Sequence, residues 1–162
     1  MIKARLQRGI TIIEFTIVAS TMLLIVLGIL EMGLFLFNMQ SLNDLTRRTA
    51  RIAAVCQVSD VNIKTLAFKE RVPDGLTPSN LNVEYLDSTG TKVDDPTLNQ
   101  NSIKYVQAYV SNFDYGFSGI LSFLGNNGVI SLPNFKTILP AESLGIGRPD
   151  PVTDAPLYIN CK

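Results

Sequence analysis

The acidic residue Glu14 lies inside an apolar stretch, residues 10–37, whose other charged residue is Glu31. A carboxylate inside a membrane span costs roughly 2.5–3.5 kcal/mol, so it marks a functional position by default. Glu14 follows Gly9 by five positions. If the chain were cut after Gly9, Glu14 would lie in the first turn of a helix, where the dipole favours a carboxylate by about 0.3–1 kcal/mol. Without a cut, Glu14 would lie near the cytoplasmic interface, and the glutamate alone leaves both readings open.

The two cysteines, Cys56 and Cys161, are the other residues with chemistry of their own. In an oxidising compartment they could pair and tie the end of the chain to its first helix. The alternative is a buried Cys56 and a free Cys161. Two thiols in an exported chain favour the disulfide, which we expect.

Enzymatic chemistry has little support in this composition. The chain has no His, which removes the usual general base and the commonest metal ligand. Two cysteines cannot build a four-thiolate zinc site, and the sequence carries no G-x-S-x-G, S-x-x-K or Walker A motif. We therefore expect no catalytic residue, no metal site, no cofactor and no enzymatic activity. Lys+Arg 14 and Asp+Glu 14 give a net charge of zero, which argues against a nucleic-acid partner.

Residues 10–37 are long enough to cross a membrane. As a helix they would measure about 42 Å, against a hydrocarbon core of about 30 Å. Lys3, Arg5 and Arg8 precede them without an acidic residue, which predicts a cytoplasmic N-terminus and a single pass. An ordinary cleaved signal has an apolar core of about 7–15 residues and a small-x-small cleavage site, and this stretch has neither. Glu31 is expected near the far interface, as a boundary marker.

Residues 8–15 (RGITIIEF) resemble the class III signal of type IV pilins and pseudopilins. That signal combines a short basic leader, a glycine at the cut, a hydrophobic first mature residue and a glutamate at mature position five. The resemblance implies that a prepilin peptidase cuts after Gly9 and methylates Ile10. It also implies that Glu14 meets the amino terminus of a neighbouring subunit during assembly.

Within that superfamily, the pair Glu14-Phe15 and the stretch ARIAAV at residues 50–55 are similar to TadE-like minor pilins. The implied partners are a prepilin peptidase, the major pilin, other minor pilins such as a TadF-like one, and an inner-membrane assembly platform with its ATPase. The implied location is the bacterial inner membrane, with a periplasmic C-terminal domain that reaches the pilus or cell surface after assembly.

The rest of the chain predicts an α+β fold, in which the long N-terminal transmembrane helix extends into a small exported domain with an antiparallel β-sheet, as in pilins. We expect a leader at 1–9, a transmembrane and assembly helix at 10–37, a continuing amphipathic helix at 38–58 and a β-rich head at 59–162. The helix carries an apolar stripe at three- and four-residue spacing, formed by Leu42, Leu45, Thr49, Ile52 and Cys56. Strands are expected at 81–85, 103–110, 129–132 and 135–139, with a short helix at 117–124 and a proline-rich tail from residue 140.

Three other functions remain open. A type IVa minor pilin or a type II secretion pseudopilin would share the cleavage motif. An uncleaved, signal-anchored periplasmic binding domain would share the apolar helix and the basic flank. An exported enzyme is the third and weakest reading, because the chain lacks histidine.

Overall fold

The computed structural model describes residues 8–70, 72–117, 119–123, 128–149, 157–158 and 160–161, with side chains from residue 11 onward. It has the expected α+β class: a long apolar helix is followed by short antiparallel strands. The chain divides into two compact units. Unit 1 comprises Met1–Phe37 and Asp114–Ser131, and unit 2 comprises Asn38–Phe113 and Leu132–Lys162.

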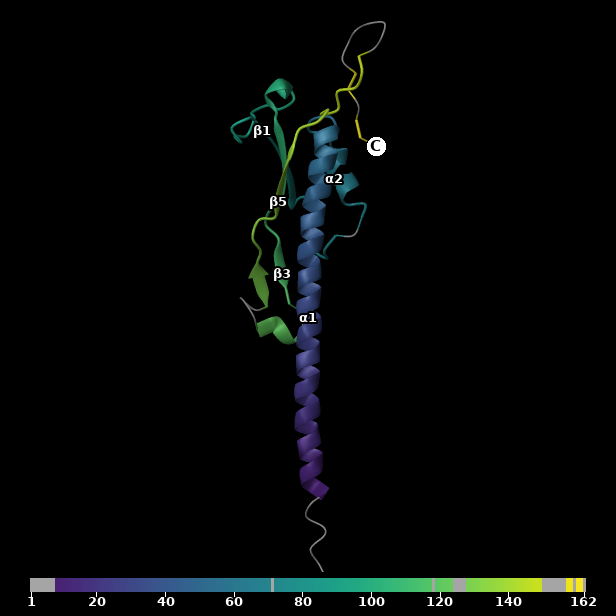
Figure 1. Ribbon diagram of the computed structural model, residues 1–162, viewed down its shortest axis with the longest axis vertical. Helices are drawn as coiled ribbons and strands as arrows, with labels where there is room; N and C mark the ends of the chain where they lie inside the picture. Colours follow the sequence, from purple (N-terminus) through teal and green to yellow (C-terminus); the bar gives the residue numbers. More distant parts are fainter. Residues whose placement is uncertain are drawn as a thin grey trace, which may run out of the picture. The chain divides into compact units, whose positions relative to one another are not determined.

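Helix α1 (Arg8–Val55) runs through the N-terminal part of unit 1 and into unit 2 (Figure 1). No proline interrupts residues 8–55, and the only glycines after Gly9 are Gly28 and Gly33. Alanines at 50, 53 and 54 add strong helix propensity where the helix leaves the apolar stretch. The sequence of this segment therefore favours one uninterrupted helix.

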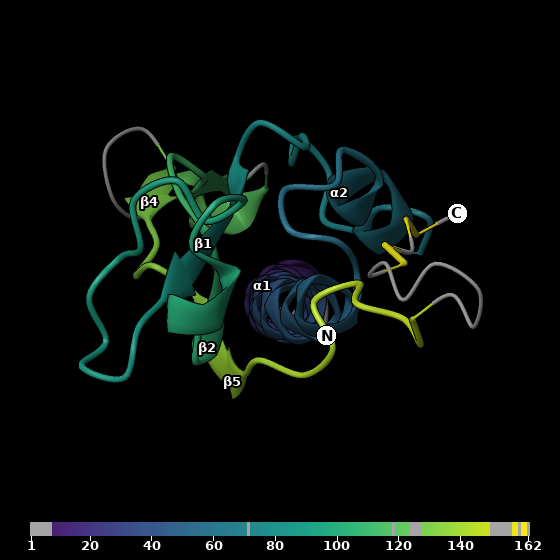
Figure 2. The same cartoon turned by 90° about the horizontal axis from the view of Figure 1, so that it is seen from above.

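Unit 2 is built around the C-terminal part of α1 and a three-stranded antiparallel sheet. The strands are β1 (Leu81–Leu86), β2 (Tyr105–Val110) and β5 (Lys136–Pro140), in the order β1-β2-β5. Figure 2 shows these strands on one side of α1 and the short helix α2 (Asn62–Ala67) on another. The central strand β2 lies within the strand expected at residues 103–110.

Small and branched apolar side chains form the core of unit 2. Leu42, Leu45, Thr49 and Cys56 of the predicted helical stripe are fully buried, and Ile52 is half-buried. On β2, Val106, Ala108 and Val110 are buried, whereas Tyr105 and Tyr109 on the opposite face are not. A single buried face is the usual pattern of an antiparallel sheet covered on one side. Burial of Tyr85 raises the pKa of its phenol, whose oxygen accepts the Ser59 N–H at 3.1 Å.

The hairpin after β1 also follows the sequence pattern. Asp87 Oδ1 accepts the Thr89 and Thr91 N–H groups, and Gly90 has φ +82°. Val93 N–H then donates to Tyr85 O at 2.9 Å. Hydrogen bonding lowers the pKa of Asp87, most of all the bond from the Thr89 side chain. This turn brings residues 92–93 back against β1.

Helix α1 ends at Val55, earlier than the expected boundary at residue 58. At this end a distant segment binds the carbonyl groups that the last helical turn leaves without a partner. Glu142 and Leu144 N–H donate to Ala54 O, and Gly145 N–H donates to Val55 O at 2.8 Å. Leu144 is buried, so this first part of the expected proline-rich tail belongs to the core.

Cys56 and Cys161 form the expected disulfide, with Cα atoms 5.5 Å apart. Asp60 and Asn62 reinforce it, because Cys161 N–H donates to Asp60 Oδ2 at 2.8 Å and Asn62 Nδ2 donates to Cys161 O at 3.0 Å. The loop that the disulfide closes spans 105 residues. A loop of that length predicts a stabilisation of about 4–5 kcal/mol from chain entropy.

Unit 1 combines the N-terminal part of α1 with a small hairpin. Strands β3 (Asp114–Gly116) and β4 (Val129–Ser131) pair antiparallel, and the 3₁₀ helix η2 (Ile120–Phe123) lies between them in the sequence. Another short 3₁₀ helix, η1 (Gln100–Ser102), belongs to unit 2. The helix expected at 117–124 is therefore present, although it is a single 3₁₀ turn.

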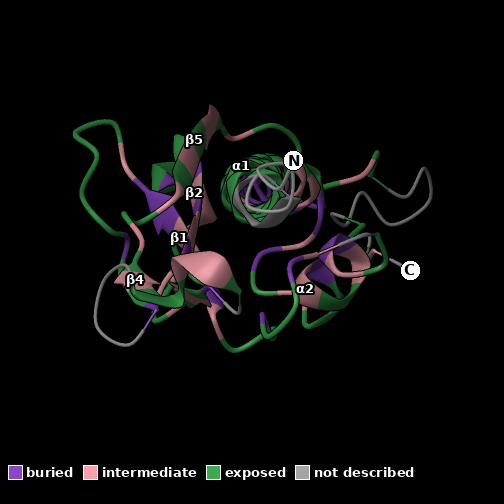
Figure 3. Ribbon diagram, turned by 90° about the horizontal axis from the view of Figure 1, so that it is seen from below, coloured by how far each residue is buried: buried purple, intermediate pink, exposed green. Residues whose placement is uncertain are grey.

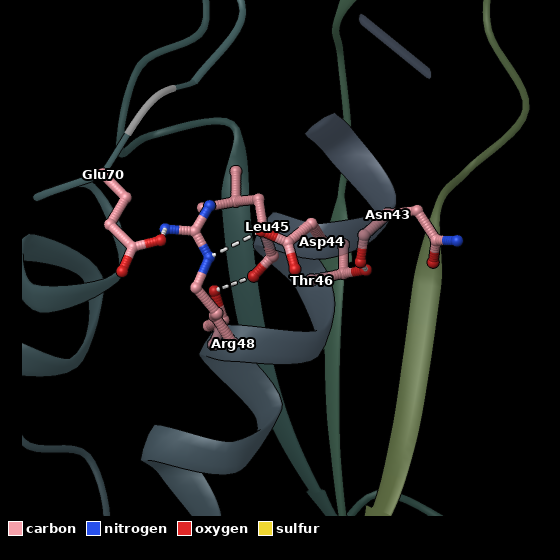
Figure 4. Close-up of polar contacts among 7 residues, drawn as sticks. Asn43, Asp44, Leu45, Thr46, Arg48 and Glu70 are labelled. Atoms are coloured by element: carbon pink, nitrogen blue, oxygen red, sulfur yellow. Dashed lines mark hydrogen bonds and ion pairs between the residues drawn. The ribbon is translucent and has the colours of Figure 1, made fainter. Parts of the chain in front are cut away.

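Arg48 is the charged residue that joins α1 to the segment after α2. Its Nε lies 3.1 Å from Asp44 Oδ2, and its Nη1 lies 2.7 Å from Glu70 Oε2 (Figure 4). Thr46, also shown in Figure 4, is fully buried and contacts Thr137 of β5 through hydroxyl oxygens 3.0 Å apart. Through these two residues, polar contacts join α1 to the segment after α2 and to strand β5.

Arg48→Met should lower the free energy of unfolding by about 1 kcal/mol, because it leaves Asp44 and Glu70 without their cation. Arg47→Met is the matched control: Arg47 is exposed, and its loss should change stability by less than about 0.5 kcal/mol. Chemical denaturation of the full chain in detergent, followed by near-ultraviolet circular dichroism, measures both. Equal effects of the two substitutions would contradict the assigned role.

Candidate assembly site

Glu14 lies on the part of α1 in which every side chain from residue 11 to residue 27 is exposed. Its neighbours Ile12, Ile13 and Phe15 are 67%, 63% and 73% exposed. Figure 3 shows the N-terminal turns of α1 in the colour of exposed residues. A helix that is apolar all round requires an apolar environment on every side, either lipid or other helices. The environment of Glu14 must therefore come from outside this part of the chain.

Three hydroxyl groups in this stretch donate to backbone carbonyl groups of the same helix. Thr16 Oγ1 donates to Ile12 O at 2.8 Å, and Thr21 Oγ1 donates to Ile17 O at 2.8 Å. Ser20 Oγ donates to Ile17 O at 3.1 Å. Such bonds back to the preceding turn let hydroxyl groups enter an apolar medium at low cost.

Glu14 differs from these hydroxyl groups. Within the described residues it accepts no hydrogen bond and forms no ion pair. A carboxylate in an apolar medium needs a cation or hydrogen-bond donors. The geometry thus leaves Glu14 able to accept a partner from another molecule.

Gly9 and Ile10, the expected cleavage and methylation residues, lie in the first turns of α1. Their side chains, and the leader residues 1–7, lie outside the described residues. The backbone at residues 9 and 10 is helical. The cut after Gly9 and the methylation of Ile10 stay predictions.

Glu31, the other acid of the apolar stretch, has partners within unit 1. Its carboxylate accepts the Gly119 N–H through Oε1 and the Leu121 N–H through Oε2, the latter at 2.6 Å. A Cβ atom at residue 119 would collide with this carboxylate, so glycine permits the close approach. We expected a boundary marker at Glu31, and the structure adds a structural role: it holds the start of η2 against α1.

An aromatic cluster lies one turn further along α1. The ring of Phe35 lies 5.2 Å from that of Tyr115 and 5.4 Å from that of Phe117, and the last two rings are 5.2 Å apart. Two of these contacts are edge-on, a favourable arrangement for aromatic rings. Glu31 and this cluster together fix the β3–β4 hairpin to α1.

Glu31→Ala should release the start of η2 while leaving the helix intact. We expect the amide hydrogens of Gly119 and Leu121 to exchange with solvent roughly tenfold faster, since each loses an acceptor worth about 1–2 kcal/mol. Hydrogen exchange of the full chain in detergent, read at single-residue resolution, measures this. Glu14→Ala is the matched control and should leave both amides unchanged; unchanged rates in Glu31→Ala would refute the contact.

One helix in the described residues is long and apolar enough to cross a membrane, with its span at Thr11–Val55 near the N-terminus. It fits a single-pass membrane anchor. The chain matches a family model described as TadE-like protein over residues 9–51. Comparisons with curated proteins and with solved structures found no match.

The family match begins at the predicted cleavage residue, Gly9, and ends within the last turns of α1. It contains Glu14 and the start of the ARIAAV stretch, the two features on which the resemblance rested. The segment from Gly9 to Arg51 is therefore similar to TadE-like proteins, in agreement with the resemblance noted in its sequence.

Proposed function

We propose that this chain is a TadE-like minor pilin or pseudopilin, made as a precursor and cut after Gly9 by a prepilin peptidase. The observation that carries the proposal is Glu14: an exposed carboxylate without a partner in the described residues, on a helix that is apolar all round. The family match over the same helix supports it. The chain would act through assembly and not through catalysis.

Cleavage would supply a positively charged partner for the Glu14 carboxylate. A cut between Gly9 and Ile10 creates a free amine at Ile10. This amine would lie at the N-terminus of the shortened helix. Amine and carboxylate are each costly in lipid when alone, and they attract strongly in a medium of low dielectric. Pairing Glu14 of one subunit with the Ile10 amine of its neighbour would satisfy both groups and set their register. Methylation of Ile10 would keep the positive charge.

The apolar helix would serve twice. Before assembly it would anchor the chain in the inner membrane, with the basic leader in the cytoplasm and unit 2 in the periplasm. After assembly the same side chains, such as Phe15 and Met22, would pack against helices of neighbouring subunits. The disulfide between Cys56 and Cys161 suits an oxidising compartment such as the periplasm.

The partners follow from this role. A prepilin peptidase would act on residues 9 and 10, and an inner-membrane platform would extract the mature subunit. The major pilin and other minor pilins, including a TadF-like one, would contact the exposed helix. The competing reading, an uncleaved signal-anchored domain, uses the same helix but gives Glu14 no task.

Glu14→Gln should separate the two readings. The variant should still enter the membrane and resist carbonate extraction, but its recovery in sheared pili should fall at least roughly tenfold, because an ion pair in an apolar medium is lost. Immunoblots of membrane and sheared fractions from the native host measure this. Ser20→Ala is the control on the same helix, since its hydroxyl contacts only its own backbone; it should assemble normally. Normal recovery of Glu14→Gln in pili would refute the pairing.

A further inference from the structure

The β3–β4 hairpin of unit 1 exposes apolar side chains and carries almost no charge. No Asp, Glu, Lys or Arg occurs between Asp114 and Lys136. Phe123, at the end of η2, is 73% exposed, and Val129 of β4 is 43% exposed. An uncharged hairpin with an exposed phenylalanine is costly in water and favourable in a lipid interface.

This hairpin is held at a defined height on α1. Glu31 accepts hydrogen bonds from the backbone of residues 119 and 121, and Phe35 contacts Tyr115 and Phe117. Figure 1 shows η2 beside α1, with helical turns of α1 continuing on its N-terminal side. All of these residues belong to unit 1. The position of the hairpin is therefore tied to that of the apolar helix.

With Ile10 at the inner edge of the hydrocarbon core, Glu31 and the hairpin it binds lie at the outer edge of that core. Glu31 lies about 31 Å along the helix from Ile10, and a hydrocarbon core is about 30 Å thick. Phe35 lies about 6 Å further along, in the headgroup layer. Aromatic side chains concentrate at that depth in membrane proteins, which suits the cluster of Phe35, Tyr115 and Phe117.

Polar backbone groups are also satisfied where the hairpin meets this layer. The Gly119 and Leu121 N–H groups donate to Glu31 and so need no water. Hydrogen bonds of this kind reduce the cost of placing irregular backbone at the edge of the hydrocarbon. The exposed face of the hairpin can then meet lipid.

We propose that the β3–β4 hairpin docks on the outer surface of the same bilayer that α1 spans, with Phe123 in the interface between headgroups and acyl chains. The occupant is lipid, because Glu31 and Phe35 fix the hairpin to a part of α1 where the apolar side chains of Leu30 and Leu34 are each 59% exposed. The docking would fix the tilt of the anchored subunit before assembly. This inference rests on the membrane anchor in the proposed function, but not on cleavage after Gly9.

The chain contains no tryptophan, so all tryptophan fluorescence of a single-Trp variant comes from the substituted position. The test uses Phe123→Trp and Val129→Trp in the full chain, reconstituted at high lipid-to-protein ratio into phosphatidylcholine vesicles brominated near the headgroup end of the acyl chain. Both variants should lose roughly half of their fluorescence relative to unbrominated vesicles and shift their emission to shorter wavelength. If one of the two variants does not fold, the other still tests the proposal.

Two controls define the scale. Leu98 belongs to an exposed loop of unit 2 and is 83% exposed. The fluorescence of the Leu98→Trp variant should therefore be the same in brominated and unbrominated vesicles. Leu24 lies within the predicted membrane span and is 54% exposed. The brominated lipid should therefore quench the tryptophan fluorescence of the Leu24→Trp variant. If Leu24→Trp is quenched and both hairpin variants behave like Leu98→Trp, the lipid docking is wrong while the anchor stands.

Other outcomes also decide between explanations. Failure to quench Leu24→Trp would overturn the anchor and the docking together. Shielding of Phe123→Trp that appears only as the protein density in the vesicles rises would assign the hairpin to contact with a second copy, and would overturn the lipid docking.

Discussion

A carboxylate on an apolar helix surface, without a partner among the described residues of its own chain, is the constraint on which the account depends. The hydroxyl groups of Thr16, Ser20 and Thr21 return to the backbone of their own helix. Glu31 accepts two N–H groups from the β3–β4 hairpin. Glu14 has no comparable contact in the described residues. Since burying an unpaired carboxylate is unfavourable, we propose that processing and assembly supply the partner of Glu14.

The same helix has two different environments, and unit 2 explains how its C-terminal part is held. There α1 presents leucine, threonine and alanine to the core, and the sheet covers them. Its last carbonyl groups are bound by residues 142–145, and the disulfide from Cys56 ties the end of the chain to the end of the helix. These contacts all join residues of unit 2 and use no side chain of residues 10–37. The proposed transfer from membrane to filament needs that independence.

The sequence predicted the elements whose signals are local. The length of the apolar stretch predicted the helix, and the three- and four-residue spacing of apolar residues predicted its buried stripe. The alternation of apolar and polar residues predicted β1 and β2. It missed contacts between residues distant in sequence: the pairing of Glu31 with η2, the salt bridges of Arg48, and the binding of the last helical turn by residues 142–145. It also missed α2, where only the spacing of Ile63 and Ala67, both buried, signals a helix. For the candidate site, chemistry and spacing singled out Glu14. Only the structure shows that nearby hydroxyl groups bond to the helix backbone, whereas the Glu14 carboxylate has no partner among the described residues.

The central claim is tested most directly by the amino terminus of the mature protein. Intact-mass and fragment-ion spectrometry of the chain extracted from native membranes measures it. The account predicts a chain that begins at Ile10, with a methyl group on the new amine that Glu14 of a neighbour is to bind. A mature chain that still carries Met1 and the leader residues would contradict it, because the cation proposed for Glu14 would then never form.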